Sequence, residues 1–511
     1  MDNINKDLRF VNITTLVFFI LTFFNLAHHS MWRDELEAWM IVRDAVSLRS
    51  LAENMRYQGH PMLWHLIFYP VTKLTRNPAS MQAVHLLIAT AVAYVFLRFA
   101  PFNKLLKGLF VFGYFPFFEY AAISRGYSIG ILLLFIFCAY IGKAPENRNY
   151  VVLSVILFLM CQCSALAAVI AIALGITIML EPFILKDFSA YSSGRFYAAC
   201  AIFAAGLTLS IIQMIPPADS YWYYPDATIH DIGRRLSERI SFFWNVFIPI
   251  PRIEPAFWDS NIITHLPLQQ DTQSNLRLIA SLGLFMVSLC FVLRKRVPAV
   301  YYIFSVVGIT AFEYIYYNGQ MRHKGHYYFA FVTAMWLGSY YTVREFKSAF
   351  LDGFFSFFEN NKGYFLAVVF SAGLIGGLIA NIYNDMYPFS ESRETADYIK
   401  RYGLQDMPIA GHMDYAASGV SAYIDRPFYY PTDNRTGTFM VWRKLRDERV
   451  DAFKSIGQFR DRVKADVLLV LNDAPPDDKI LQYKLVLLKA FTNSIRPDEN
   501  FYLYLMRYVR T

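Results

Sequence analysis

Residues 10–27 read FVNITTLVFFILTFFNLA, and the chain continues over residues 28–37 as HHSMWRDELE. The first stretch is long enough to cross the ~30 Å hydrocarbon core of a bilayer as an α-helix. It lacks the small-residue cleavage site of a signal peptide and follows Lys6 and Arg9, so we expect a retained helix with a cytoplasmic N-terminus. The acidic pair Asp34-Glu35 follows directly after it, where the outer membrane surface begins.

The composition of the whole chain is typical of a polytopic membrane protein. Hydrophobic residues make up 56% of its 511 residues and charged residues only 17%, whereas soluble proteins average about 25% charged. The 46 Phe, 35 Tyr and 8 Trp residues suit the aromatic belts of membrane interfaces. The composition therefore excludes ordinary soluble, coiled-coil and disordered proteins. The net charge of +8 lies in loops without a basic stripe or an RNA-binding motif, so we expect no nucleic-acid partner.

Charge is distributed unevenly between two parts of the chain. Residues 388–511 hold 19 Lys/Arg and 17 Asp/Glu, whereas the preceding 387 residues hold 52 charged residues in all. We therefore expect a transmembrane part over residues 1–387 and a small soluble α/β domain over residues 388–511. The apolar runs 466–471 and 502–506 of this domain are strand-like, and it lacks GxGxxG, P-loop and Ser-nucleophile motifs.

The pattern predicts about eleven membrane-spanning helices. Apolar runs after residues 10–27 begin near Met81, Leu105, Ile123, Tyr150, Ala165, Phe196, Leu276, Ala299, Tyr327 and Tyr364. Residues 61–74 are apolar but short, and we place them as an interfacial helix because this puts the short basic turns on one side. Those turns contain Arg98/Lys104, Lys143/Arg148, Lys186/Arg195, Arg294-Lys295-Arg296 and Arg344/Lys347/Lys362.

This topology describes a multi-pass protein of the cell inner (plasma) membrane. The odd number of spans sends residues 388–511 to the periplasmic, or outer, side. The first outer loop, residues 28–60, and the long outer loop, residues 216–275, face the same side. The long loop carries the aromatic run 221–225 (YWYYP), which is suited to stacking on sugar faces or to lining the interface.

Two features of this outer face combine charge with apolar surroundings. Neighbouring carboxylates on a helix point in different directions, so Asp34 and Glu35 suit two roles, such as a general base and an orienting group or metal ligand. The alternative is a solvated helix start that the helix dipole stabilises. Arg125, within YAAISRGY (120–127), lies at the outer end of a span. A guanidinium there pairs with a carboxylate or a lipid phosphate, or extends to the headgroups.

A basic cluster occupies residues 322–326, which read RHKGH and lie between two spans on the same face. Its cationic groups are able to surround an anion or to anchor to lipid headgroups. A basic cluster on the outer side departs from the usual charge bias of membrane proteins, which favours a functional role.

The first outer loop resembles that of a known enzyme family. It opens with WRDE (32–35) and closes with GHPMLW (59–64), and SRGY (124–127) follows at a later span. In this order they resemble the GT-C superfamily of polyprenyl-phosphate-sugar-dependent glycosyltransferases, especially the lipid A aminoarabinose transferase and the protein O-mannosyltransferases. The resemblance covers about the first 210 residues well and the remaining spans in layout. The family's double proline is Pro61-Met62 here, and the tail matches no particular acceptor class.

The resemblance implies a role for each candidate residue. Asp34 occupies the position of the catalytic base, with Glu35 beside it, and Arg125 that of a donor-phosphate contact. The further candidates for the phosphate are Arg322, Lys324 and His326. Arg33 and His60 are candidates for orienting the acceptor. Glu35 and His60 are the candidate ligands of a divalent metal ion, in whose use related enzymes differ.

The implied reaction takes sugar from a lipid carrier. The chain has no sizeable cytosolic part to bind a nucleotide sugar, so the donor would be a polyprenyl-phosphate-linked sugar that has crossed the bilayer. The acceptor would be an envelope glycolipid, a polysaccharide or a protein. One base without a second nucleophile implies inversion at the sugar.

Two other classes of function remain open at this stage. An O-antigen-type polymerase or ligase also has many spans and a large outer loop, but its chemistry usually rests on Arg and His residues. A lipid or solute transporter is expected to show internal repeats, and we find none. The sequence does not specify the sugar, the acceptor, the oligomeric state or the role of the C-terminal domain.

Overall fold

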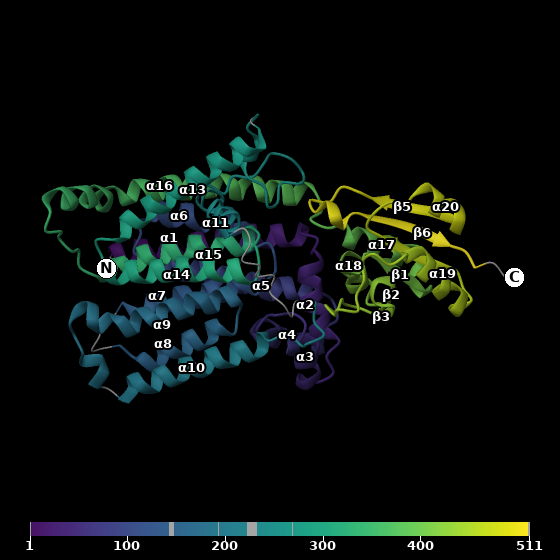
Figure 1. Cartoon of the computed structure of the whole chain (residues 1–511), viewed down its shortest axis with the longest axis horizontal. Helices are drawn as coiled ribbons and strands as arrows, with labels where there is room; N and C mark the ends of the chain where they lie inside the picture. The colour runs from purple at the N-terminus through teal and green to yellow at the C-terminus, as the bar shows by residue number, and fades with distance from the viewer. Residues whose placement is uncertain (1, 143–147, 193, 222–231, 268, 509–511) are drawn as a thin grey trace.

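A computed structural model of the chain describes all residues except 1, 143–147, 193, 222–231, 268 and 509–511. A bundle of long helices occupies one end of the molecule and a small sheet domain the other, with the N-terminus at the far end of the bundle from the sheet (Figure 1). Lys143 and most of the aromatic run 221–225, singled out above, lie outside the described residues.

Seven helices in the described part of the chain are long and apolar enough to cross a membrane. They are α1 (Asp2–His28), α5 (Ala79–Phe99), α9 (Ala165–Leu185), α10 (Gly194–Met214), α13 (Gln270–Val292), α14 (Arg296–Ile315) and α16 (Ala349–Met386). Their positions match seven of the runs predicted from hydropathy. The helical membrane fold predicted from the sequence is therefore confirmed.

Shorter helices lie at the four other predicted positions. They are α6 (Lys104–Val111) with the π-helix η1 (Tyr114–Glu119), α7 (Tyr127–Ile141), α8 (Tyr150–Cys161) and α15 (Met321–Leu337). At 1.5 Å per residue, the 12-residue α8 extends only ~18 Å. Helix α8 packs against α7, α9 and α10, so its neighbours rather than lipid alone cover it.

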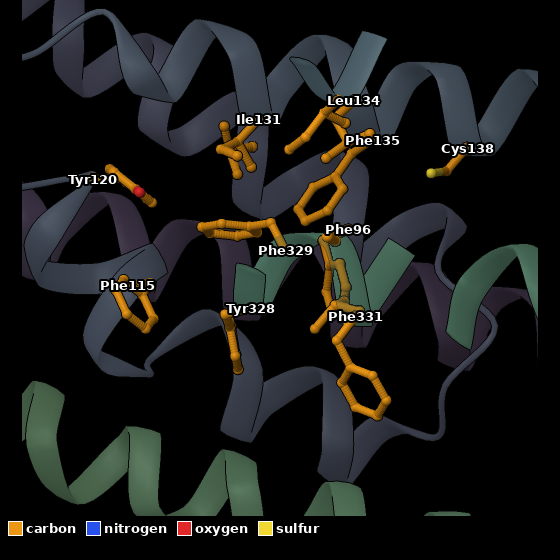
Figure 2. Close-up of a cluster of buried hydrophobic side chains, with 14 of the residues drawn as sticks. Phe96, Phe115, Tyr120, Ile131, Leu134, Phe135, Cys138, Tyr328, Phe329 and Phe331 are labelled. Atoms are coloured by element: carbon orange, nitrogen blue, oxygen red, sulfur yellow. The ribbon is translucent and has the colours of Figure 1, made fainter. Parts of the chain in front are cut away.

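An aromatic core fastens these shorter helices together. Phe96 of α5 stacks on Phe110 of α6 with ring centroids 3.8 Å apart, and Phe329 of α15 packs against Phe135 of α7. Figure 2 shows this cluster, in which Phe115 of η1 and Tyr328 of α15 also face each other. These ring contacts therefore fix the positions of α15 and of the turn 120–126. Both segments carry predicted site residues.

Three short helices build the first outer loop. They are α2 (Arg33–Arg43), α3 (Leu48–Met55) and α4 (Leu63–Leu74). Helix α4 has 12 residues, too few to cross the hydrocarbon core, which favours the interfacial placement of residues 61–74. It packs against α2 through the edge-to-face contact of Trp39 with Phe68. Short helices α11 (Ile232–Ile240) and α12 (Phe242–Phe247) lie in the long outer loop.

The C-terminal domain is the predicted α/β domain. Its sheet has the strand order β3-β2-β1-β4-β6-β5, with β1 parallel to β2 and β4 and the other pairs antiparallel. The strands are β1 (Ile409–His412), β2 (Phe428–Tyr430), β3 (Arg435–Gly437), β4 (Val467–Leu471), β5 (Leu485–Phe491) and β6 (Phe501–Met506). Strands β4 and β6 match the two strand-like runs of the sequence.

Helices cover both faces of this sheet. They are α17 (Ser392–Arg401), α18 (Asp414–Ile424), α19 (Ala452–Val463) and α20 (Asp477–Tyr483). All residues of β4 are buried, and they alternate between two cores, with Leu468 and Val470 beside α17 and α18 and Leu469 beside α19. Helix α18 also packs against α2, so the domain contacts the first outer loop directly.

Gly376 of α16 marks a close helix–loop contact that is open to a test. A Cβ atom there would lie 2.0 Å from the carbonyl oxygen of Pro249, whereas nothing lies within 4 Å of a Cβ at Gly353 of the same helix. We expect Gly376→Ala to lower the midpoint of thermal unfolding in detergent and the yield of folded protein, because the backbone must shift. Gly353→Ala is the matched control and should be neutral or stabilising by up to about 1 kcal/mol. Equal behaviour of the two variants would contradict this packing.

Candidate functional site

The candidate site centres on Asp34 in the first turn of α2. Its Oδ2 atom lies 2.8 Å from Nη1 of Arg125 and 3.3 Å from Nη2 of Arg322. Nε of Arg33 lies 4.0 Å from Oδ1. Three predicted site residues from three distant parts of the chain, Asp34, Arg125 and Arg322, therefore meet in one cluster.

The arginines determine the protonation state of Asp34. Burial acts to raise the pKa of Asp34, but the charges of Arg125 and Arg322 outweigh it and lower the pKa below its usual range. Asp34 is therefore a carboxylate at neutral pH. Its proton affinity depends on how closely the two guanidiniums approach it.

The turn between η1 and α7 positions Arg125. The neighbouring Gly126 packs against α4, where an added Cβ would lie 3.1 Å from Cβ of Trp64. Only a residue without a side chain fits this approach comfortably. The turn therefore sits against the interfacial helix, and Arg125 points from it to Asp34.

Aromatic rings support Arg322 at the start of α15. Its guanidinium lies 5.1 Å from the ring centroid of Trp32 and 5.3 Å from that of Trp258, and these two rings pack edge to face 4.9 Å apart. The hydroxyl of Tyr120 donates a hydrogen bond to the carbonyl oxygen of Arg322. The cation–π contacts stabilise a charge that would otherwise be costly to bury, and the hydrogen bond from Tyr120 fixes the backbone at Arg322. Nε of Arg322 is buried and has no hydrogen-bond partner among the described residues.

Glu35 points away from Asp34 and is fully buried. Its carboxylate accepts hydrogen bonds from Nε2 of His29 (2.9 Å), from the backbone N–H of Trp32 (3.2 Å) and from that of Ser124 (2.6 Å). These contacts join the end of α1, the start of α2 and the turn that carries Arg125. Glu35 thus holds the framework of the site, while its neighbour Asp34 faces the arginines.

Arg33 faces the C-terminal domain. Its Nη2 lies 2.7 Å from Oδ2 of Asp498, and its backbone N–H donates to both carboxylate oxygens of Glu499 at 3.1 and 3.3 Å. Its guanidinium lies 4.6 Å from the ring centroid of Tyr415. The sequence predicted a role in orienting the acceptor, whereas the structure places Arg33 in a contact between two parts of the chain.

His60 and Glu37 lie close enough to the cluster for its charges to affect them. Burial, together with the positive charge of Arg125, lowers the pKa of His60 to about 4, so its ring is neutral at pH 7. Burial and the charge of Asp34 raise the pKa of Glu37 to about 7. Nε2 of Gln58 donates a hydrogen bond to Glu37 at 3.0 Å. Glu37, which the sequence did not single out, is therefore a second carboxyl group able to exchange a proton near neutral pH.

Lys324 and His326 make contacts within the helix bundle instead. Nζ of Lys324 lies 2.7 Å from Oε2 of Glu313 on α14, and both groups are buried. Nδ1 of His326 lies 2.8 Å from the carbonyl oxygen of His323. An unpaired buried ammonium is costly, so the pair with Glu313 explains the position of Lys324. Of the basic residues 322–326, Arg322 is the one whose ion pair with Asp34 the structure describes.

The candidate metal ligands do not suit a metal ion. No group of three or more His, Cys, Asp or Glu residues is arranged to hold one among the described residues. The carboxylate of Glu35 already accepts three hydrogen bonds, and the guanidiniums around Asp34 would repel a divalent cation. We therefore assign no metal to Glu35 and His60.

Other charged residues of the cluster were not predicted. Asp259 of the long outer loop accepts a hydrogen bond from the backbone N–H of Met321 at 3.0 Å. Arg496 of the tail lies 5.5 Å from the ring of Trp32 and 5.1 Å from that of Trp258, opposite the same ring pair that Arg322 contacts. Neither residue lies in a motif, and for Arg496 the one signal in the sequence was the high charge of the tail.

Comparisons with known proteins give the fold a second line of support. No family model matches the chain, and a search of curated proteins gave no match. Among solved structures, the chain is similar to the crystal structure of ArnT from Cupriavidus metallidurans bound to undecaprenyl phosphate. The TM-score is 0.51 at 12% sequence identity, and the alignment covers 98% of this chain and 97% of that chain. At this identity the likeness establishes a shared fold, which is the GT-C-like fold predicted from the first outer loop.

The role of Glu35 as a framework residue is testable by its effect on stability. Glu35→Ala leaves three buried donors, on His29, Trp32 and Ser124, without their acceptor, at a cost of about 1–3 kcal/mol each when unsatisfied. We expect a clear fall in the thermal unfolding midpoint of the purified protein. Glu53→Ala is the control, because Glu53 pairs with Arg49 on the exposed face of α3, and it should change stability by at most about 0.5 kcal/mol. Native stability in Glu35→Ala would refute the framework role.

Proposed function

We propose that this protein is a membrane glycosyltransferase. It transfers a sugar from a polyprenyl-phosphate-linked donor to a hydroxyl group of an extracytoplasmic glycolipid, polysaccharide or protein, with inversion at the anomeric carbon. The observation that carries the proposal is the carboxylate of Asp34 held between Arg125 and Arg322. The fold shared with ArnT, whose crystal structure holds undecaprenyl phosphate, supports the same conclusion.

In the proposed reaction the acceptor oxygen attacks the anomeric carbon of the donor sugar. The bond between that carbon and the phosphate oxygen breaks, and the polyprenyl phosphate leaves with the bonding electrons. Asp34 accepts the proton of the acceptor hydroxyl as general base. Arg125 and Arg322 stabilise the negative charge that grows on the leaving phosphate, which planar guanidiniums can bind through two parallel hydrogen bonds.

The same two arginines link donor binding to the strength of the base. The charges of Arg125 and Arg322 lower the pKa of Asp34 below its usual range, so Asp34 is a weak proton acceptor. A donor phosphate placed between the guanidiniums competes for them. The pKa of Asp34 then rises towards its ordinary value while the phosphate is bound. Asp34 therefore becomes an effective base only after the donor has entered.

We also propose that the site faces the outside of the cell. Helix α2, which carries Asp34, lies at the end of the bundle next to the C-terminal domain, whereas the start of α16, which follows the predicted cytoplasmic basic turn 344–347, lies at the other end (Figure 1). In the proposed orientation the reaction takes place on the side to which a lipid-linked sugar has already been moved. The site then needs no nucleotide-sugar-binding domain.

Substitution of Asp34 tests its role as the general base. Asp34→Asn keeps the shape of the side chain but removes its ability to accept a proton, so transfer from a synthetic polyprenyl-phosphate sugar should fall by ~10²-fold or more. Glu37→Gln, one helical turn further along α2, is the matched control and should retain most activity, although Glu37 titrates near neutral pH. Size exclusion checks folding of both variants. A large loss in Glu37→Gln with an active Asp34→Asn would assign the base to Glu37 and refute our assignment.

The second prediction concerns the phosphate contact. Arg125→Lys keeps the charge but loses the planar fork, so turnover should fall about 10- to 100-fold, as expected for the loss of a charged hydrogen bond of ~1.5–3 kcal/mol. Expression and unfolding temperature should stay close to the wild type because the ion pair with Asp34 remains possible. Wild-type turnover in Arg125→Ala would show that Arg125 has no part in the reaction.

The third prediction tests orientation with cysteines introduced at exposed positions. Leu481 of the C-terminal domain is 78% exposed, and Val343, beyond the far end of α15, is 43% exposed. The five native cysteines are buried or partly buried. A membrane-impermeant maleimide should label Leu481→Cys in intact cells and Val343→Cys only after permeabilisation. The reverse pattern would exclude an outward-facing site.

A further inference from the structure

The C-terminal domain contacts the backbone of the segment that leads to Asp34. Nη2 of Arg393 donates a hydrogen bond to the carbonyl oxygen of His29 at 2.6 Å. The backbone N–H of Met31 donates to the hydroxyl of Tyr423 at 3.0 Å. Together with the hydrogen bond from the backbone N–H of Arg33 to Glu499, these contacts hold the segment that leads into α2 at residues 29, 31 and 33.

The contact with Glu499 has the geometry of a helix cap. Trp32 is the N-cap of α2, so Arg33 is the first residue of the helix. The first backbone N–H groups of a helix have no partner inside it. The N–H of Arg33 finds its acceptor in Glu499, a residue 466 positions later in the chain. A carboxylate at a helix N-terminus also interacts favourably with the helix dipole.

Ion pairs strengthen this cap. The guanidinium of Arg33 lies 2.7 Å from Asp498 and 3.6 Å from Glu499, so it sits between the tail carboxylates and α2. The side chain of Glu499 is fully buried. Burial raises the pKa of Glu499 to about 7, and the charge of Arg33 opposes that rise. Arg33 therefore offsets part of the cost of burying the carboxyl group of Glu499 beside the first turn of α2.

The tail also reaches the other side of the cluster. Arg496 lies 3.1 Å from Asp498 and packs over Trp32 and Trp258. Arg322 packs over the same two rings and contacts Asp34. Residues 496–499 therefore contact both the helix that carries Asp34 and the rings that support one of its arginines.

We propose that residues 496–499 are part of the catalytic site, with Asp498 and Glu499 as positioning residues that fix the first turn of α2 and thereby aim Asp34. This inference rests on the proposed function. Asp34 is the residue directly after Arg33, so a change in the position of the Arg33 amide moves Asp34 with it. A displacement of about 1 Å at a reacting group is enough to cost ~10²-fold in rate.

The test compares full-length purified variants. Asp498→Asn and Glu499→Gln weaken the contact with Arg33, and Asp498→Asn is the milder change because this side chain is partly exposed. Asp425→Asn is the matched control: it removes ion pairs between the same domain and Arg43 at the other end of α2 and Arg76. Asp425 has a positive φ of 56°, a conformation that Asn adopts readily.

Two readouts separate positioning from mere stabilisation. The first is kcat and KM for a synthetic polyprenyl-phosphate sugar, and the second is hydrogen exchange of the amides of residues 31–36. We expect kcat to fall about tenfold in Asp498→Asn and further in Glu499→Gln, with KM for the donor close to the wild type. Amides 31–36 should exchange faster in both variants. Asp425→Asn should keep wild-type kcat and wild-type exchange at residues 31–36.

The outcomes distinguish this inference from the proposed function. Wild-type kcat in folded Asp498→Asn and Glu499→Gln would overturn the positioning role, whatever the exchange rates. An equal loss of kcat in Asp425→Asn would overturn it as well. If the wild-type protein transfers no sugar, the proposed function is wrong. Hydrogen exchange then still shows whether Asp498 and Glu499 hold the first turn of α2. Unchanged exchange at residues 31–36 in Glu499→Gln would then overturn the capping role as well.

Discussion

The ion pairs between Asp34 and the guanidiniums of Arg125 and Arg322 are the interaction on which the rest of the site depends. They join the first outer loop, the turn before α7 and the start of α15 through charged groups, beside the hydrogen bonds of Glu35 and Tyr120 that also link these segments. Charges in such partly buried positions are stable only when paired, and removing one partner leaves the others uncompensated. The buried network of Glu35 and the rings around Arg322 therefore serve to keep this cluster assembled.

The sequence revealed the parts of this cluster but not its assembly. Hydropathy located helices at all the predicted positions, and short apolar runs located β4 and β6, because these signals are local. Asp34, Arg125 and Arg322 stood out singly as charges beside apolar runs. The helix pattern does not show which of Asp34 and Glu35 faces the arginines. Adjacent helix positions point in different directions, and only the surrounding contacts decide which side chain is buried. In the sequence Lys324 looked equivalent to Arg322, because its partner, Glu313, lies on another helix.

The tail was the least predictable element for a physical reason. Its hydrogen bonds to the segment that leads to Asp34 join residues more than 350 positions apart, and a hydrogen bond to a backbone group leaves no pattern in the sequence. Asp498 and Glu499 look like ordinary charges in a charged domain. Their significance comes from the short 3₁₀ turn η8 (Pro497–Glu499), which directs them at Arg33.

The cap on α2 has a consequence for how the site forms. Glu499 lies between the end of β5 and the start of β6, so its position depends on the pairing of these two strands. The first turn of α2 therefore acquires its complete set of hydrogen bonds only when the C-terminal sheet has folded and docked. Because Asp34 lies in that turn, the arrangement of the proposed base depends on both the helix bundle and the sheet. The C-terminal domain thus supplies contacts that hold the first turn of α2, and it is not structurally independent of the site.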